Sequence, residues 1–121
     1  MVNTHARGIR GEDLAVDFLQ KKGYHIVKRN YHFERGEIDV IAEHGGLLVF
    51  VEVKARRSGQ VGLPEDSITP SKRDRMLKVA EGYLMQHRLS GQDCRFDVVA
   101  IEWLTDGVQI RHRENVFDGG F

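Results

Sequence analysis

Two stretches of the chain decide its fold: GEIDVIA at residues 36–42 and VFVEVK at residues 49–54. Both stretches are predicted to be strands, and His44-Gly45-Gly46 between them is predicted to close a hairpin. The run at residues 47–51 is apolar on both faces, as expected of a central strand. The second strand of the hairpin is therefore expected to lie inside a sheet that is covered on both sides.

Helix and strand signals outside this hairpin complete the predicted order αβββαββ. Apolar residues at helical spacing, with Gly23 as a stop, predict a helix before the hairpin. Thr69 as N-cap and Pro70 at the first helical position predict a second helix, which crosses over to add a fourth strand. The predicted fold class is α/β, a mixed five-stranded sheet flanked by helices. The predicted elements are helices at residues 8–22 and 70–89 and strands at 24–31, 37–43, 47–55, 95–102 and 107–113.

Length and composition restrict the class of protein. The chain has 121 residues, of which 40% are hydrophobic and 30% charged, and this predicts one domain over residues 1–121. With Cys94 as the single cysteine, an intramolecular disulfide is excluded, which fits a reducing compartment. The sequence shows no secretory signal pattern and no apolar run of about 20 residues, so the protein is expected to be cytoplasmic.

Acidic side chains on the two hairpin strands point to metal chemistry. Because side chains alternate between the faces of a strand, Glu37 and Asp39 share one face, and so do Glu52 and Lys54. Burying paired acids on adjacent strands costs free energy, and a divalent cation is the simplest way to offset it. Glu-x-Lys on a strand is usually an exposed ion pair, but the apolar strand and its acid-bearing neighbour favour a site here.

Phosphodiester hydrolysis needs a water nucleophile and stabilisation of the charge that develops on the phosphoryl oxygens. Mg²⁺ held by one or two carboxylates supplies both, and Mn²⁺ is an alternative ion. Asp39 and Glu52 are the expected carboxylate ligands, and the backbone carbonyl of Val53 is a further one. Lys54 would orient the water, neutralise the phosphate or take part in proton transfer, and the sequence leaves these roles open.

Glu12 is a further candidate, because it lies on the apolar side of the first predicted helix, near Ala15 and Leu19. An acid in this position is either a residue at the edge of the apolar stripe or a buried ligand. Gly8 and Gly11 each weaken a helix by about 1 kcal/mol relative to Ala, which fits the close approach of a backbone or a phosphate. Both interpretations of Glu12 remain open at this point.

Positive charge is concentrated between residues 54 and 78, although Lys+Arg and Asp+Glu both total 18 and the formal net charge is zero. This span holds seven cations and three acids. The free amide groups at the start of the second helix also favour anions. A locally basic region fits contact with a nucleic-acid backbone, and a solvated helix face is the alternative. The candidate nucleic-acid-binding residues are Arg56, Arg57, Lys72, Arg73 and Arg75.

Other residue types with chemical potential give weaker signals. The six histidines include no pair at zinc-ligand spacing and are interpreted as ordinary residues rather than ligands. Cys94 has no activating base nearby in the sequence and is interpreted as a buried structural thiol. The sequence contains no phosphate-binding or dinucleotide-binding fingerprint.

Four ordered blocks of the chain resemble the YraN-like family of uncharacterised bacterial proteins. These blocks are Arg7-Gly8-x-x-Gly11-Glu12-x-x-Ala15, Gly36-Glu37-Ile38-Asp39-Val40-Ile41-Ala42, Phe50-Val51-Glu52-Val53-Lys54-Ala55-Arg56 and Arg95-Phe96-Asp97-Val98-Val99-Ala100. That family resembles a branch of the PD-(D/E)XK nuclease superfamily and is similar to the archaeal Holliday junction resolvases. The resemblance implies a restriction-endonuclease-like core whose active-site residues are Glu12, Asp39, Glu52 and Lys54, with Glu37 as an auxiliary acid. Gly36-Glu37-Ile38-Asp39 stands where the superfamily has Pro-Asp.

The expected function is that of a magnesium-dependent endonuclease acting on nucleic acid, DNA rather than RNA, with branched or damaged DNA as candidate substrates. The alternative is a non-catalytic nucleic-acid-binding module on a nuclease fold, which the neutral net charge favours. An RNA-processing nuclease would use the same residues. Because a DNA junction has two-fold symmetry and resolvase-like enzymes act on it as dimers, a homodimer is a further candidate state.

Overall fold

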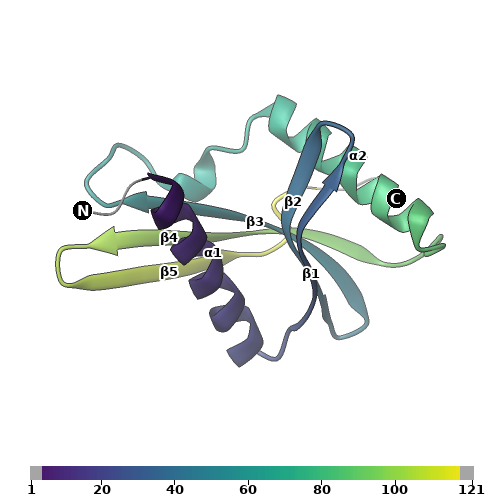
Figure 1. Cartoon of the computed structure of the whole chain (residues 1–121), viewed down its shortest axis with the longest axis horizontal. Helices are drawn as coiled ribbons and strands as arrows, with labels where there is room; N and C mark the ends of the chain where they lie inside the picture. Colours follow the sequence, from purple (N-terminus) through teal and green to yellow (C-terminus); the bar gives the residue numbers. More distant parts are fainter. Residues whose placement is uncertain (1–3, 118–121) are drawn as a thin grey trace.

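A five-stranded sheet with a helix on each face forms the described part of the chain (Figure 1). The computed structural model describes the backbone of residues 4–117 and the side chains of residues 10–117. The predicted order αβββαββ and the mixed sheet are confirmed. The elements are α1 (Thr4–Lys21), β1 (His25–Phe33), β2 (Gly36–His44), β3 (Leu47–Arg57), the 3-10 helix η1 (Pro64–Asp66), α2 (Pro70–Gln86), β4 (Cys94–Leu104) and β5 (Gly107–Arg113).

Element bounds differ from the sequence prediction mainly where contacts between distant segments extend an element. β3 was predicted to end at residue 55 but continues to Arg57, because β4 pairs with it as far as Arg57↔Trp103. α2 ends at Gln86 rather than at residue 89, and His87 takes the C-cap position. η1 was not predicted. Neither described helix combines the length and the apolarity needed to cross a lipid bilayer.

The strands lie in sequence order across the sheet. β1, β2 and β3 form the predicted antiparallel meander, β3 and β4 are parallel, and β5 returns antiparallel to β4. A parallel neighbour needs a crossover connection, and α2 supplies it between β3 and β4. α2 packs on β1 and β2, whereas α1 packs on β3, β4 and β1.

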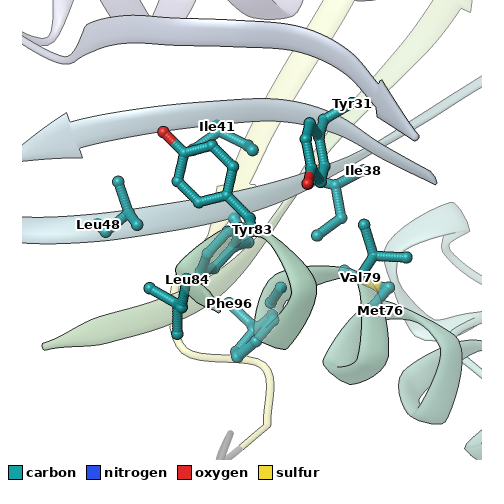
Figure 2. Close-up of a cluster of buried hydrophobic side chains, with 11 residues drawn as sticks. Tyr31, Ile38, Ile41, Leu48, Met76, Val79, Tyr83, Leu84 and Phe96 are labelled. Carbon is teal, nitrogen blue, oxygen red and sulfur yellow. The ribbon is translucent and has the colours of Figure 1, made fainter. Parts of the chain in front are cut away.

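Alternate side chains of β3 join two separate hydrophobic clusters. Val49 and Val51 face α1, and Leu48 and Phe50 face α2. The central strand is therefore buried on both sides, as its apolar sequence predicted. Figure 2 shows the α2 cluster, in which Tyr31, Ile38, Ile41, Leu48 and Phe96 of the sheet meet Met76, Val79, Tyr83 and Leu84 of the helix.

Close packing of α1 on the sheet depends on Gly11. A Cβ atom built on Gly11 would lie 2.6 Å from the Cβ of Ala55 in β3, closer than two side-chain carbons approach. Gly11 is thus a position of close approach between α1 and the sheet, as the glycine in the sequence indicated. The side-chain surroundings of Gly8 lie outside the described residues.

Gly11→Ala is expected to lower the free energy of unfolding by about 1–2 kcal/mol, because overpacking against Ala55 outweighs the gain of about 1 kcal/mol in helix propensity. Urea denaturation measures the change. Adding Ala55→Gly should recover part of the loss, because it removes the Cβ atom that the new side chain would meet. Ala55→Gly alone should weaken the strand. A Gly11→Ala variant as stable as the parent would show that α1 does not need this close contact.

Candidate functional site

β2 and β3 separate where the candidate acids lie. Their antiparallel ladder ends at the pair Val40↔Val51, just before Asp39 and Glu52 would face each other. The Asp39 carboxyl group replaces the lost backbone contact, because its Oδ2 accepts a hydrogen bond from the N–H of Val53 at 2.8 Å. The two strands therefore open around the Asp39 side chain, and we call this opening the hairpin gap.

Asp39 and Glu52 form a pair of carboxyl groups at the hairpin gap. Glu52 is only 4% exposed, and its face of β3 is the one that packs toward α2. Burial, a hydrogen bond with Glu52 and the charge of Glu52 raise the pKa of Asp39 to about 8, although the N–H of Val53 acts in the opposite direction. Ionisation of Asp39 beside Glu52 is therefore unfavourable at neutral pH.

Glu12 approaches this pair from α1. Its charge contributes to the raised pKa of Asp39. The Glu12 carboxylate is fixed by β1: Arg29 Nη2 donates to Glu12 Oε1 at 3.1 Å and Asn30 Nδ2 donates to the same oxygen at 2.9 Å. The Glu12 side chain is 15% exposed, so it is only partly buried and lies between the two interpretations left open by the sequence.

Arg29 and Asn30 were not singled out in the sequence, although Asn30 carried a signal. Asn30 lies between the pairs Arg29↔Val40 and Tyr31↔Ile38, and so opposite Asp39. Its φ of 53° is in the left-handed region, which Asn tolerates better than most residues. An asparagine within an otherwise ordinary strand is the pattern that could have drawn attention to this position.

Two lysines flank Glu52. The Lys72 ammonium lies 2.7 Å from Glu52 Oε2. Lys72 is in the first turn of α2, where Thr69 is the predicted N-cap and its Oγ1 accepts from the Lys72 N–H at 3.1 Å. Lys54 is half-buried, shares the face of Glu52 by strand alternation, and forms no ion pair with a described side chain. Lys72 thus neutralises a candidate ligand, and Lys54 remains available to an external anion.

The donor set at the hairpin gap suits a hard divalent cation. Asp39 and Glu52 offer carboxylate oxygens, which Mg²⁺ and Mn²⁺ prefer. The N–H and C=O of one strand residue point to the same side of the strand. The Val53 carbonyl therefore faces the hairpin gap together with the Val53 N–H, which donates to Asp39. A dication here would replace the proton on Asp39 and offset the burial and the repulsion that raise the pKa of Asp39.

The five candidate nucleic-acid-binding residues occupy different environments. Arg57 is exposed at the end of β3, and Arg75 is exposed on α2 beside a cavity. Arg73 lies 3.7 Å from Asp74 on the solvent side of α2. Arg56 is half-buried beside Glu102 and Lys72 is paired with Glu52, so both of these cations already have acidic partners.

Arg56 belongs to a charged network that anchors the loop between β3 and α2. Its Nε lies 3.5 Å from Glu102 Oε2, and its guanidinium donates to the carbonyls of Val61 and Gly62. Arg111 links the same network to η1, with its Nε 2.5 Å from Glu65 Oε2. Hydrogen bonding from Arg111 lowers the pKa of the buried Glu65. We therefore assign Arg56 to the loop anchor rather than to phosphate contact.

A second polar network lies on the α1 face, where Asp97, His112 and Glu114 place potential ligand atoms within 4.8 Å of one another. Arg95 Nε donates to Asp97 Oδ1 at 2.9 Å, and the Lys22 ammonium lies 2.7 Å from His112 Nδ1. Although burial raises it, hydrogen bonds from His112 and Arg95 hold the pKa of Asp97 below its usual value. Arg95 and Lys22 already bind side chains of this cluster, so we assign the cluster a structural role. Asp97 and His112 are 15 residues apart in the sequence, which hid the cluster.

The αβββαββ core, with carboxylates at an opened β2–β3 hairpin and a glutamate from α1, has the architecture of a restriction-endonuclease-like fold. The model of the uncharacterised protein family UPF0102 matches residues 11–101. The chain belongs to this family, and the YraN-like resemblance seen in the sequence is confirmed.

Relatives of similar length support this assignment. A UPF0102 protein of Syntrophus aciditrophicus is 41% identical over 92% of this chain and 87% of its own length. A UPF0102 protein of Symbiobacterium thermophilum is 44% identical over 91% of this chain and 94% of its own length. A third, from Neisseria meningitidis serogroup C, is 46% identical over 81% of this chain and 85% of its own length. The family match at residues 11–101 therefore includes the hairpin gap, α2 and the part of α1 from Gly11 onward.

Proposed function

We propose that this protein is a metal-dependent nuclease that hydrolyses phosphodiester bonds at the hairpin gap, with DNA as its substrate. The observation that carries the proposal is the Asp39–Glu52 pair, whose mutual repulsion and burial raise the pKa of Asp39 to about 8. Two carboxyl groups facing each other between strands destabilise a fold, so their presence is better explained by a ligand than by packing.

Each residue of the site has a distinct part in this proposal. Asp39 and Glu52 hold the cation, and the Val53 N–H fixes the orientation of the Asp39 carboxylate. Glu12, positioned by Arg29 and Asn30, supports the cation or its water shell. Lys54 neutralises the phosphate. Mg²⁺ or Mn²⁺, when bound, would polarise the phosphoryl oxygen and lower the pKa of the attacking water.

A second candidate function is binding of nucleic acid without cleavage. The Lys72–Glu52 ion pair favours it, because an ammonium at 2.7 Å already neutralises one of the two ligands. The neutral net charge of the chain favours it as well, since a nuclease that acts alone on DNA is usually basic. In this case the acids would keep their position but hold no cation.

Incubation with a panel of labelled DNA substrates distinguishes the two functions. The panel comprises blunt, nicked, flapped and four-way-junction duplexes together with single-stranded DNA and RNA of the same sequence. The proposal predicts cleavage of at least one substrate in Mg²⁺ or Mn²⁺ and none in EDTA. Salt-dependent binding without cleavage in either metal would support the second function and reject the first.

A further inference from the structure

A groove between the β1–β2 turn and α2 leads away from the hairpin gap. Two adjoining cavities of about 350 Å³ and about 650 Å³ form it. Arg35 of the turn and Gly36 at the start of β2 line both cavities, and Lys72, whose ammonium contacts Glu52, lines the smaller one. Figure 1 shows the tip of the β1–β2 hairpin beside α2. Lys72 therefore lies between the groove and the site proposed for hydrolysis.

The turn is held tightly against α2, which makes the groove a built feature of the fold. A Cβ atom built on Gly36 would lie 2.5 Å from Val79 Cγ2 and 3.6 Å from the backbone oxygen of Arg75. Only a residue without a side chain allows this approach. The position of Arg35 relative to Arg75 is thus set by the contact between turn and helix.

Positive charge dominates the walls of the groove. Glu34 and Glu37 are its only carboxylates among the described residues, and Glu37 is already paired with His32 at 3.2 Å. Cations that have no acidic partner attract phosphate groups. Their binding releases the counterions that surround the nucleic acid. The groove cations without an ion pair to any side chain of residues 10–117 are Arg35, Arg75 and Lys78.

Phe33 adds an aromatic surface to the larger cavity. Its ring lies across Gly82 of α2, where a Cβ atom would come within 2.6 Å of the ring carbons. The side chain is half-buried against the α2 cluster and also lines the cavity. Aromatic rings among cations bind bases by stacking and phosphates by charge, which is the pattern of sites for single-stranded nucleic acid.

We propose that this groove binds an unpaired segment of nucleic-acid strand next to the scissile phosphodiester. The base stacks on Phe33, and the phosphates contact Arg35, Arg75 and Lys78. A duplex does not offer this contact, because its bases are already stacked on one another. This inference rests on the proposed function and gives it a substrate class: strands that carry an unpaired segment beside the cleaved bond.

Fluorescence anisotropy in calcium tests the groove without cleavage. The probes are a blunt DNA duplex and the same duplex with an unpaired tail of DNA or RNA at either end. The parent should bind a tailed duplex more tightly than the blunt one. Phe33→Leu, which keeps apolar bulk over Gly82, should weaken binding of the tailed duplex about tenfold and change the blunt duplex less than about twofold.

Charge variants give an independent readout on exposed positions. Arg75→Ala combined with Lys78→Ala should weaken binding of the tailed duplex about tenfold, with a smaller salt dependence. The matched control, Lys21→Ala combined with Arg88→Ala, removes the same charge from exposed positions outside the groove and should change binding less than about twofold. Because these four side chains are exposed, the comparison stands even if Phe33→Leu fails to fold.

Each outcome decides the inference. Equal affinity of the parent for tailed and blunt duplexes overturns it, as does a control variant that loses as much affinity as the groove variant. Metal-dependent cleavage with no preference for a tail leaves hydrolysis standing and rejects the groove. Tail-dependent binding that the groove variants abolish, without cleavage of any substrate, keeps the groove and rejects hydrolysis.

Discussion

Glu52→Gln is expected to lower the rate of metal-dependent cleavage by about 1000-fold or more, which corresponds to about 4 kcal/mol of transition-state stabilisation. Glutamine fills the same space on β3 but removes the negative charge that holds the cation. The Lys72 ammonium, now without its partner at 2.7 Å, would add positive charge to the site and oppose metal binding further. Single-turnover cleavage of the best substrate in Mg²⁺ measures the effect.

The matched control for this variant is Glu43→Gln. Glu43 is an exposed acid on β2, outside the hairpin gap, and pairs with Leu48 in the ladder. Its replacement should change the cleavage rate less than about twofold, within the usual range for an exposed substitution away from a site. A Glu52→Gln variant that cleaves as fast as Glu43→Gln would exclude Glu52 as a ligand.

Asp39→Asn is expected to raise the free energy of unfolding at pH 8.5 by up to about 6 kcal/mol, the full value of the pKa shift, and to leave it nearly unchanged at pH 4. The folded pKa of Asp39 is about 8, above its unfolded value of 3.8. Between these values the folded protein binds more protons than the unfolded chain, so the parent loses stability as pH rises. Asparagine never ionises, and its side-chain oxygen can still accept from the Val53 N–H.

Thermal or urea denaturation across this pH range, in EDTA, measures the difference between parent and variant. The difference should grow between pH 4 and 8 and then become constant. Asp106→Asn, an exposed substitution in the β4–β5 turn, is the control and should follow the parent at every pH. A difference that is constant with pH would show that Asp39 is ionised throughout and that its pKa is not raised.

The position of the acids was predictable because it depends on periodicity alone. Strand alternation places Asp39 and Glu52 on defined faces, and the apolar run before Glu52 indicates a buried strand. Thr69 followed by Pro70 fixed the start of α2 in the same way, since a cap and a proline act locally. These features depend only on residues that are neighbours in the sequence, and all of these features are present in the structure.

The contacts that surround the acids depend on where each strand ladder ends. The hairpin gap exists because the β2–β3 ladder stops at Val40↔Val51 while β3 continues beside β4, and no local pattern encodes this stop. Arg29 and Asn30 meet Glu12 across 17 or 18 residues, and Lys72 meets Glu52 across 20. Partners at such separations are chosen by tertiary packing, which hydrophobic periodicity does not describe.

Charge composition was the least informative feature, for a physical reason. The basic span between residues 54 and 78 contains cations in three different environments: Arg56 in the loop anchor, Lys72 on a carboxylate and Arg75 in a groove. A count of charges along the chain does not separate internal pairs from free cations. The groove instead combines Arg35 of the β1–β2 turn with α2, so its charge is assembled by folding.

Calorimetric titration with Mn²⁺ at pH 7, in two buffers with different ionisation enthalpies, measures cation binding at the hairpin gap together with the protons that binding releases. If the hairpin gap is a metal site, a divalent cation must displace the proton that the raised pKa of Asp39 retains at this pH. We expect that the parent binds the cation and releases close to one proton per ion bound, while Asp39→Asn and Glu52→Gln bind the cation at least about tenfold more weakly. Equal Mn²⁺ affinity in parent and Asp39→Asn, or binding without proton release, would contradict this expectation.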